Sequence, residues 1–165
     1  LEYLKNNHDS YFAYGFDLFE DLETEVFGDK QTHELRNKWN TLNVAGVGEL
    51  NTLLTSMGYT NFSLVKGSSE LTVPTIDDSI DVCLIDGNHT YNQVKLDFES
   101  VYRKCKVGSV IVFDNSSNDI EPDPRYVAVD GGPWKFCQEL KKNTSVKFMG
   151  MVNRCSFFSV QKSEG

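Results

Sequence analysis

The hydrophobic pattern is clearest between residues 80 and 115, where it predicts a strand, a helix and a second strand. The run IDVCLID is almost continuously apolar, as expected for a parallel strand that is buried on both faces. Thr90 and Gln93 form a capping-box signature at a helix start. Apolar residues then recur at three- and four-residue steps and mark one face of that helix: Tyr91, Val94, Phe98, Val101, Tyr102 and Cys105. Gly108 closes the connection, and the run SVIVFDN predicts the second strand.

Weaker patterns on either side predict further elements. The chain opens with LEYLKNN, a helix fragment, and with a β-prone aromatic run that ends at Asp17. Helical spacing predicts two helices, at about 32–39 and 47–57, and NFSLVK predicts a strand that ends at Gly67. After a long polar loop, a short helix is expected at about 134–141. The runs VKFMGMV and CSFFSVQ, joined by Asn-Arg, predict a terminal antiparallel hairpin.

Strands that alternate with helices predict a doubly wound α/β sheet, mostly parallel, that ends in the antiparallel hairpin. With 165 residues, the chain has the length of a single domain. Ligands of such sheets bind outside the carboxyl ends of the strands. Four polar residues and a glycine fall at strand ends of this kind: Asp17, Gly67, Asp86, Asp114 and Asn115. Their positions predict a binding site at this edge of the sheet.

The composition narrows the classes of partner. Apolar residues make up 39% and charged residues 24% of the chain, values typical of a soluble globular protein. The net charge of −8, without a dense basic run, argues against a broad nucleic-acid or anionic-membrane surface. No apolar run reaches the length of a membrane span, and the four cysteines form no CxxC pair. We therefore expect no membrane association, no signal peptide, reduced thiols and a cytoplasmic location.

Asp86 and Asp114 are the most informative pair of strand-end residues. If their strands are neighbours, the two ends lie about 4.8 Å apart, the usual spacing of paired strands. Two close carboxylates repel each other, and a bound cation relieves that repulsion. With the amide oxygen of Asn115 they form an all-oxygen ligand set, which suits Mg²⁺ or Ca²⁺ better than zinc. Alternatively, Asp86 caps the next helix while Asp114 and Asn115 form an Asx turn.

The segment IDVCLIDGNHTY…VGSVIVFDN resembles the second half of a class I S-adenosylmethionine-dependent methyltransferase. Its pattern is similar to that of bacterial sugar and small-molecule O-methyltransferases and of metal-dependent enzymes of the catechol and caffeoyl-CoA type. The resemblance covers nearly the whole chain from Ser10 onward and is specific across 81–115. It implies a Rossmann-like fold and S-adenosylmethionine as cofactor. It also implies a divalent metal, Mg²⁺ or another, that is held by Asp86, Asp114 and Asn115 and binds the hydroxyl groups of a small substrate.

The resemblance also assigns residues to the cofactor. Asp17 sits where the family's acid binds the ribose hydroxyls, although a solvated acid after a strand is the alternative. The segment KGSSEL matches the part of the family that packs on the adenine, and its alternative is an ordinary turn. An asparagine two positions after Asp86 would face the methionine end of the cofactor or the substrate. The residues assigned in this way are Asp17, Gly67, Ser69, Glu70, Asp86 and Asn88.

His89 lies three positions beyond Asp86, where catechol-type relatives carry a basic residue that accepts the substrate's proton. The resemblance implies that the metal lowers the pKa of a bound hydroxyl and that His89 or water takes the proton. The oxygen then displaces the sulfonium methyl group in line, which makes His89 and Asp86 the expected catalytic residues. Alternatively, His89 only hydrogen-bonds a backbone group. Asp97 recurs in the bacterial pattern, but a solvent-facing helix acid explains it equally well.

One part of the family pattern is absent, the glycine-rich loop between the first strand and the first helix. LEYLKNN would be the helix directly after it, so we expect that strand and loop upstream of Leu1, in the same domain. Otherwise, the chain is a degenerate, non-catalytic methyltransferase-like module for assembly or partner binding. A dehydrogenase needs a phosphate-binding glycine loop, and a hydrolase would be supported by GxSxG; neither is present. We expect a small hydroxylated substrate, no nucleic-acid or membrane partner, and a homo-oligomer as an open alternative to a monomer.

Overall fold

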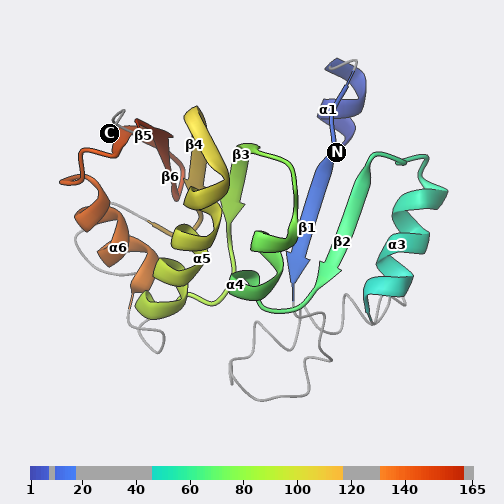
Figure 1. Ribbon diagram of the computed structural model, residues 1–165, viewed down its shortest axis with the longest axis horizontal. Coiled ribbons are helices and arrows are strands. Elements are labelled where there is room, and N and C mark those ends of the chain that lie inside the picture. Colours follow the sequence, from blue (N-terminus) through green and yellow to red (C-terminus); the bar gives the residue numbers. More distant parts are fainter. Residues whose placement is uncertain (8–9, 18–45, 117–130, 162–165) are drawn as a thin grey trace. The chain divides into compact units, whose positions relative to one another are not determined.

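The computed structural model describes residues 1–7, 10–17, 46–116 and 131–161 (Figure 1). The described chain falls into two compact units, Leu1–Ser68 and Ser69–Gly165, and each is treated by itself. The helix expected at 32–39 lies outside the described residues, as does most of the polar loop before the last helix. In the part of the chain that is described, no helix is long and apolar enough to cross a membrane.

The first unit contains a pair of parallel strands and two helices. Its elements are α1 (Glu2–Asn7), β1 (Ala13–Asp17), α3 (Val47–Ser56) and β2 (Phe62–Lys66). Ala13 lies opposite Phe62, and Asp17 lies opposite Lys66, so both strands end at the same edge. Both strands and α3 were predicted from the sequence, and the structure confirms them. No described residue of this unit is buried.

The second unit is a four-stranded mixed sheet with helices. Its elements are α4 (Ser69–Thr72), a 3-10 turn (Val73–Thr75), β3 (Ile80–Ile85), α5 (Tyr91–Lys104), β4 (Cys105–Phe113), α6 (Gly132–Leu140), β5 (Val146–Val152) and β6 (Cys155–Val160). The strand order is β3-β4-β6-β5, with β3 parallel to β4 and β6 antiparallel to both of its neighbours. The predicted strand–helix–strand segment and the terminal hairpin are confirmed.

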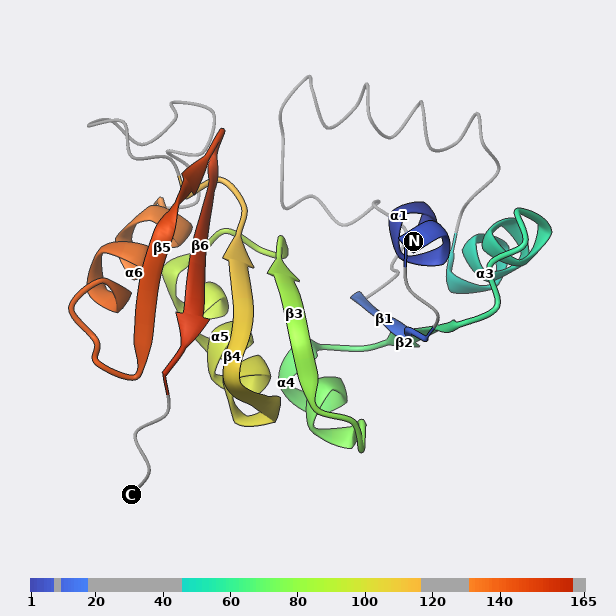
Figure 2. The same ribbon diagram turned by 90° about the horizontal axis from the view of Figure 1, so that it is seen from above.

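Aromatic rings fill the space between the sheet and its helices. In Figure 2 the four strands lie in front of α5 and α6, which both cover one face of the sheet. Phe98 of α5 and Phe136 of α6 have ring centroids 5.3 Å apart. Phe113 of β4 lies 5.9 Å from Phe136 and 5.7 Å from Phe158 of β6. This cluster anchors the carboxyl end of β4, because Phe113 is the last residue of that strand.

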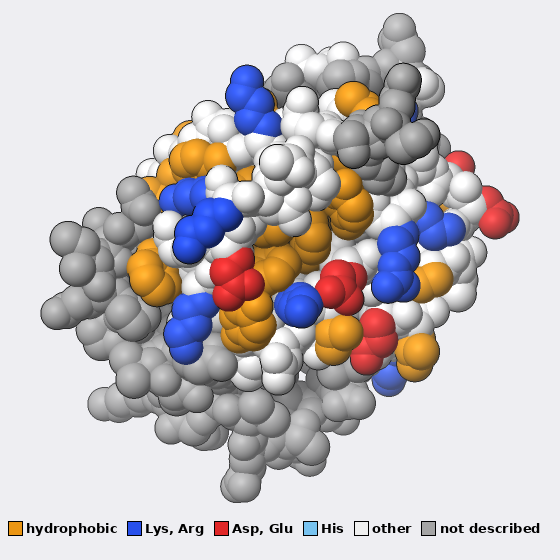
Figure 3. All heavy atoms as spheres, turned by 60° about the vertical axis from the view of Figure 1, so that its left-hand side comes forward, with side chains coloured by type: hydrophobic (Ala, Val, Ile, Leu, Met, Phe, Trp, Pro, Cys, Tyr) orange, Lys and Arg blue, Asp and Glu red, His pale blue; other side chains and the backbone are white. Residues whose placement is uncertain are grey.

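The opposite face of the sheet is more exposed than the sequence predicts. Ile85 is buried, but Val82 and Leu84 of the same strand are 69% and 60% exposed. The expectation that this strand is buried on both faces is therefore wrong for the described chain. The register puts Leu84 beside Val112, so this apolar face extends onto β4. Figure 3 shows the molecule from another side, where apolar side chains gather in the middle and charged side chains lie around them.

Two element boundaries also differ from the prediction. Cys105 was expected on the helix face, but α5 ends at Lys104, and Cys105 has an extended backbone and begins β4. That strand runs through Gly108, whose φ of 88° lies in the left-handed region. The register between β3 and β4 shifts between Ile80 and Val82, so the sheet accommodates an irregularity there.

Candidate functional site

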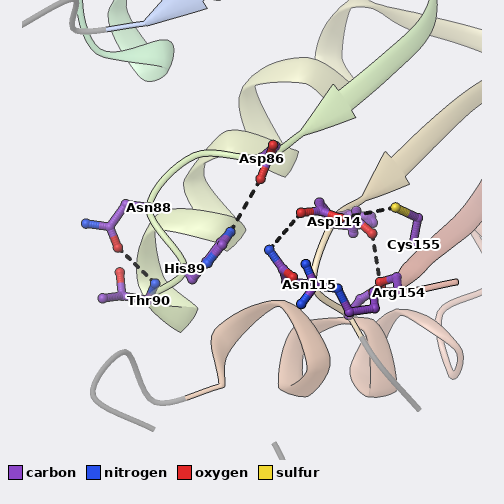
Figure 4. A network of polar contacts seen from close by, with 10 residues as sticks. Asp86, Asn88, His89, Thr90, Asp114, Asn115, Arg154 and Cys155 are labelled. Atoms are coloured by element: carbon purple, nitrogen blue, oxygen red, sulfur yellow. Dashed lines mark hydrogen bonds and ion pairs between the residues drawn. The ribbon is translucent and has the colours of Figure 1, made fainter. Parts of the chain in front are cut away.

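The carboxyl ends of β3 and β4 lie side by side. Ile85 pairs with Phe113, and the backbone N–H of Asp114 donates to the carbonyl oxygen of Ile85 at 3.1 Å. The residues that follow this pair are Asp86 and Asp114. The two strands are therefore neighbours, which is the condition on which the predicted meeting of Asp86 and Asp114 depends, and Figure 4 shows the turn with Asp86 next to the turn with Asp114.

Asp114 and Asn115 form a tight polar turn at the end of β4. Asn115 has a φ of 50°, a left-handed conformation that asparagine tolerates better than most residues. Its Nδ2 donates to Oδ2 of Asp114 at 2.7 Å, while the thiol of Cys155 donates to Oδ1 at 3.2 Å. Both oxygens of this carboxylate therefore accept a hydrogen bond within the protein.

The amide oxygen of Asn115 is the unusual atom of the site. It is buried and forms no hydrogen bond with any of the described residues. A buried carbonyl oxygen without a partner costs about 1–3 kcal/mol, so such an atom calls for an explanation. A hard cation supplies one, because amide and carboxylate oxygens are its usual ligands. Among the described residues, however, no three His, Cys, Asp or Glu side chains are placed to share a metal ion.

His89 turns back toward Asp86 across the loop after β3. Its Nε2 lies 3.5 Å from Oδ1 of Asp86, and the two side chains are 14% and 52% exposed. A carboxylate beside an imidazole helps to fix the orientation of the ring. The arrangement suits a base that accepts a proton next to an exposed acid. The predicted roles of both residues in catalysis stay predictions.

The loop that carries His89 is fixed at the start of α5. Thr90 is the N-cap of that helix and accepts a hydrogen bond from the backbone N–H of Gln93 at 3.4 Å. The backbone N–H of Thr90 itself donates to Oδ1 of Asn88 at 2.9 Å, which closes an Asx turn. The alternative in which Asp86 caps the helix is therefore wrong. Only half of the predicted capping box forms, because the Gln93 side chain does not turn back to Thr90.

The start of α6 packs directly against the same loop. The backbone N–H of Gly132 donates to the carbonyl oxygen of His89 at 3.1 Å. A Cβ atom on Gly132 would lie 2.3 Å from the backbone nitrogen of Tyr91 and 2.4 Å from that carbonyl oxygen. Only glycine fits there without a shift of the backbone. Sequence analysis missed this residue, because nothing in the local pattern indicates that two distant segments touch.

Ser69 and Glu70, at the start of α4, join a second polar cluster. The hydroxyl of Ser69 donates to Oδ1 of Asp97. The side-chain Nε2 of Gln93 donates to the same oxygen at 2.9 Å and lies 3.4 Å from Oε2 of Glu70. Asp97 is only 8% exposed, so the interpretation as a solvent-facing helix acid is wrong. The roles of Ser69 and Glu70 in cofactor binding stay predictions.

Asp17 and Gly67 belong to the first unit and lie together there. The backbone N–H of Gly67 donates to the carbonyl oxygen of Asp17 at 2.9 Å. Asp17 is exposed, and the φ of Gly67 is 141°, which favours glycine. The two residues thus sit at the ends of paired strands, as expected, and their assignment to the cofactor stays a prediction.

Cys155 is a second residue of the site that sequence analysis missed. Burial raises the pKa of its thiol, and the neighbouring carboxylates of Asp114 and Asp86 raise it further. The thiol therefore stays protonated and donates to Asp114 at neutral pH. The signal lies in the register, because Ser156 pairs with Phe113, and the residues beyond that pair, Cys155 and Asp114, then meet at the strand ends.

Comparison with protein families gives a match over most of the chain. Residues 1–116 fit the model of a family described as a methyltransferase domain. No curated protein matches the sequence. The match covers more than half of the 165 residues and includes β3, α5, β4 and the residues at both strand ends.

Solved structures share the fold at low sequence identity. "Structure of the O-methyltransferase NovP" is 16% identical, with 96% of this chain and 63% of that chain covered and a TM-score of 0.55. A putative rRNA-methylase from Clostridium thermocellum is 13% identical, with 93% and 74% covered and a TM-score of 0.56. The SAH-bound Podospora anserina methyltransferase PaMTH1 is 13% identical, with 70% and 56% covered and a TM-score of 0.52. These likenesses confirm the predicted Rossmann-like α/β fold. The chain spans less than two thirds of NovP and of PaMTH1.

Proposed function

Since the chain belongs to the methyltransferase domain family, we propose that it catalyses S-adenosylmethionine-dependent O-methylation of a small hydroxylated molecule, assisted by a divalent cation. The observation that carries the proposal is the pair of neighbouring strand ends, where Asp86 and Asp114 meet beside the buried amide oxygen of Asn115, which has no hydrogen-bond partner among the described residues. Oxygen atoms of this kind suit Mg²⁺. The likeness to a structure that binds S-adenosylhomocysteine supports the cofactor.

We assign the cation to Asp86, Asp114 and Asn115. When bound, a divalent cation polarises a substrate hydroxyl and lowers its pKa. Asp86 is exposed and available for such a contact, whereas each oxygen of Asp114 already accepts one hydrogen bond, from Asn115 or Cys155, and keeps a second lone pair. The amide oxygen of Asn115 gains a partner that the described protein does not give it.

We assign the general base to Nε2 of His89. The loop is held by Thr90 on one side and Gly132 on the other, so the ring is positioned before substrate arrives. After His89 accepts a proton from the substrate hydroxyl, the Asp86 carboxylate at 3.5 Å stabilises the imidazolium. The substrate oxygen attacks the methyl carbon, and the sulfonium is released as a neutral thioether.

We keep the cofactor residues that the sequence predicted, and we describe them unit by unit. Those of the first unit are Asp17 and Gly67, and those of the second are Ser69, Glu70, Asp86 and Asn88. An acid such as Asp17 accepts hydrogen bonds from ribose hydroxyls, and a glycine lets the backbone approach a ligand closely.

The net charge of −8 favours a small substrate over an rRNA. The fold alone does not make this choice, because the similar structures include an O-methyltransferase and a putative rRNA-methylase. The second candidate function is a non-catalytic module for assembly or partner binding. It is favoured by the lack of three acidic, histidine or cysteine side chains around one metal position among the described residues.

Calorimetric titration of S-adenosylhomocysteine into the full-length protein tests the proposal, once with Mg²⁺ and once with EDTA. We expect binding, and we expect Mg²⁺ to be required for methyl transfer to vicinal diols or catechols.

Asp86→Ala is expected to lower kcat/KM by about 100-fold or more, and His89→Ala by about 100- to 10,000-fold. Asp81→Ala is the control, because Asp81 is an exposed acid on the same strand that pairs with Lys106. Absence of binding to the folded protein would leave the non-catalytic module.

A further inference from the structure

Asp97 is a buried acid that the proposed reaction does not use. It lies on α5 and is 8% exposed. Among the described residues, no lysine or arginine forms an ion pair with it, and its hydrogen bonds come from Ser69 and Gln93. A buried carboxylate is costly unless its hydrogen bonds are made, so this one needs those two donors to stay in place.

The carboxylate of Asp97 lies where three segments of the second unit come close together. Ser69 donates from the start of α4, twenty-eight positions away in sequence. Gln93 donates from the first turn of α5 and reaches Glu70 as well. The other oxygen, Oδ2, faces the turn after β3, where a Cβ atom on Gly87 would lie 3.3 Å from it.

These segments carry the residues that we assign to the cofactor in the second unit. Ser69 and Glu70 lie on α4, and Asp86 and Asn88 flank Gly87. The main packing of α5 does not depend on Asp97, because Phe98 and Val101 are buried on the same helix. What Asp97 adds is a hydrogen bond that ties α4 to the helix, while its other oxygen faces the Gly87 turn.

We propose that Asp97 is a positioning residue for cofactor binding, which acts through Ser69 and the Gly87 turn without touching the reacting atoms. This inference rests on the proposed function. On this inference, Ser69 and Glu70 of α4 recognise the nucleoside end of the cofactor. Their polar atoms are in position to do so only while Asp97 holds that short helix.

The test compares Asp97→Ala and Asp97→Asn in the full-length protein. Asparagine keeps an oxygen that can accept from Ser69 and Gln93, so it should rescue binding, whereas alanine cannot. We expect the Kd for S-adenosylhomocysteine to rise about 10-fold or more in Asp97→Ala and less than about 3-fold in Asp97→Asn. The KM for S-adenosylmethionine should rise in parallel while kcat at saturation stays within about 2-fold.

Two further variants separate this role from general stability. Ser100→Ala is the matched control, because Ser100 is buried on the same helix and, among the described residues, its hydroxyl bonds only the Leu96 carbonyl at 2.9 Å. It should leave the affinity unchanged. In a double-mutant cycle, Ser69→Ala and Asp97→Ala together should weaken binding by less than the sum of the two single losses, because both changes remove the same hydrogen bond.

The outcomes are distinct. If wild type binds S-adenosylhomocysteine and folded Asp97→Ala binds it equally well, the positioning role is overturned and the proposed function stands. Additive losses in the cycle overturn the role as well. If wild type binds nothing, the proposed function falls and takes this inference with it. Should Asp97→Ala fail to fold, Gln93→Leu decides: severalfold weaker binding at wild-type stability supports the role, and unchanged binding overturns it.

Discussion

The two units of the chain differ in how firmly they hold their strand-end residues. Every buried residue that the structure describes belongs to the second unit, where Phe113 and Phe158 are fully enclosed. In the first unit none of the described residues is buried, and two paired strands alone are marginally stable. Asp86 and Asp114 therefore stand on a packed scaffold, whereas the described surroundings of Asp17 do not suffice to fix it. A packed core in the second unit, and no buried residue among those described in the first, predict different tolerance to mutation.

Truncation of a phenylalanine in each unit should give the largest difference in stability between the two units. Phe113→Ala should lower the free energy of unfolding by about 3–5 kcal/mol, because it opens a cavity next to Phe98, Phe136 and Phe158. Phe16→Ala is the matched variant in β1, where the ring is only partly buried and stacks on Tyr14. It should cost about 1 kcal/mol. Urea denaturation followed by circular dichroism measures both, and equal losses would remove the distinction between the units.

Alanine in place of glycine gives the next largest effect. Gly132→Ala forces the backbone away from Tyr91 and His89 and should cost about 1–3 kcal/mol. It should also move the imidazole signals of His89 in the NMR spectrum. Gly48→Ala is the control, because a Cβ atom there meets nothing within 4 Å and Gly48 lies inside α3. That change should stabilise the protein by about 0.5–1 kcal/mol. A Gly132→Ala protein as stable as wild type would mean that α6 does not clamp the loop.

The sequence was sufficient for those parts of the site that depend on neighbouring strands. The apolar runs around residues 80–113 predicted β3, α5 and β4, because period and length distinguish the helix from the strands. Once two successive parallel strands are neighbours, the residues after them must meet. The juxtaposition of Asp86 and Asp114 was therefore within reach of sequence analysis.

Other features depend on contacts between segments that are far apart in the chain. The close approach of Gly132 to the His89 loop and the contact of Cys155 with Asp114 join segments about forty residues apart. Gln93 shows the same limit locally: its pattern predicts a capping box, but its side chain instead bonds Asp97. Tertiary partners outcompete the local motif, and a single sequence does not reveal them. The exposure of β3 likewise depends on what covers the sheet, which hydrophobicity cannot specify.

The smallest expected effect is a dependence of stability on alkaline pH. It tests how well the core of the second unit excludes water, a property for which the first unit has no described counterpart. Burial raises the pKa of the Cys137 thiol from 9.0 to about 12, although hydrogen bonds with Ser116 and Ser156 act in the opposite direction. Above pH 9 the unfolded chain releases this proton while the folded protein retains it. The contribution of Cys137 to stability is therefore complete below pH 9 and is lost as the pH rises toward 12.

Cys137→Ala removes that titration. Wild type is expected to be the more stable protein at pH 7, and its advantage should shrink by about 1 kcal/mol between pH 7 and pH 10. Val160→Ala serves as the control, because Val160 is equally buried and does not ionise. The difference between wild type and that variant should stay constant with pH. Denaturant unfolding at both pH values measures the difference in the free energy of unfolding between wild type and each variant. If the difference for Cys137→Ala is as constant with pH as that for Val160→Ala, water reaches this thiol in the folded protein.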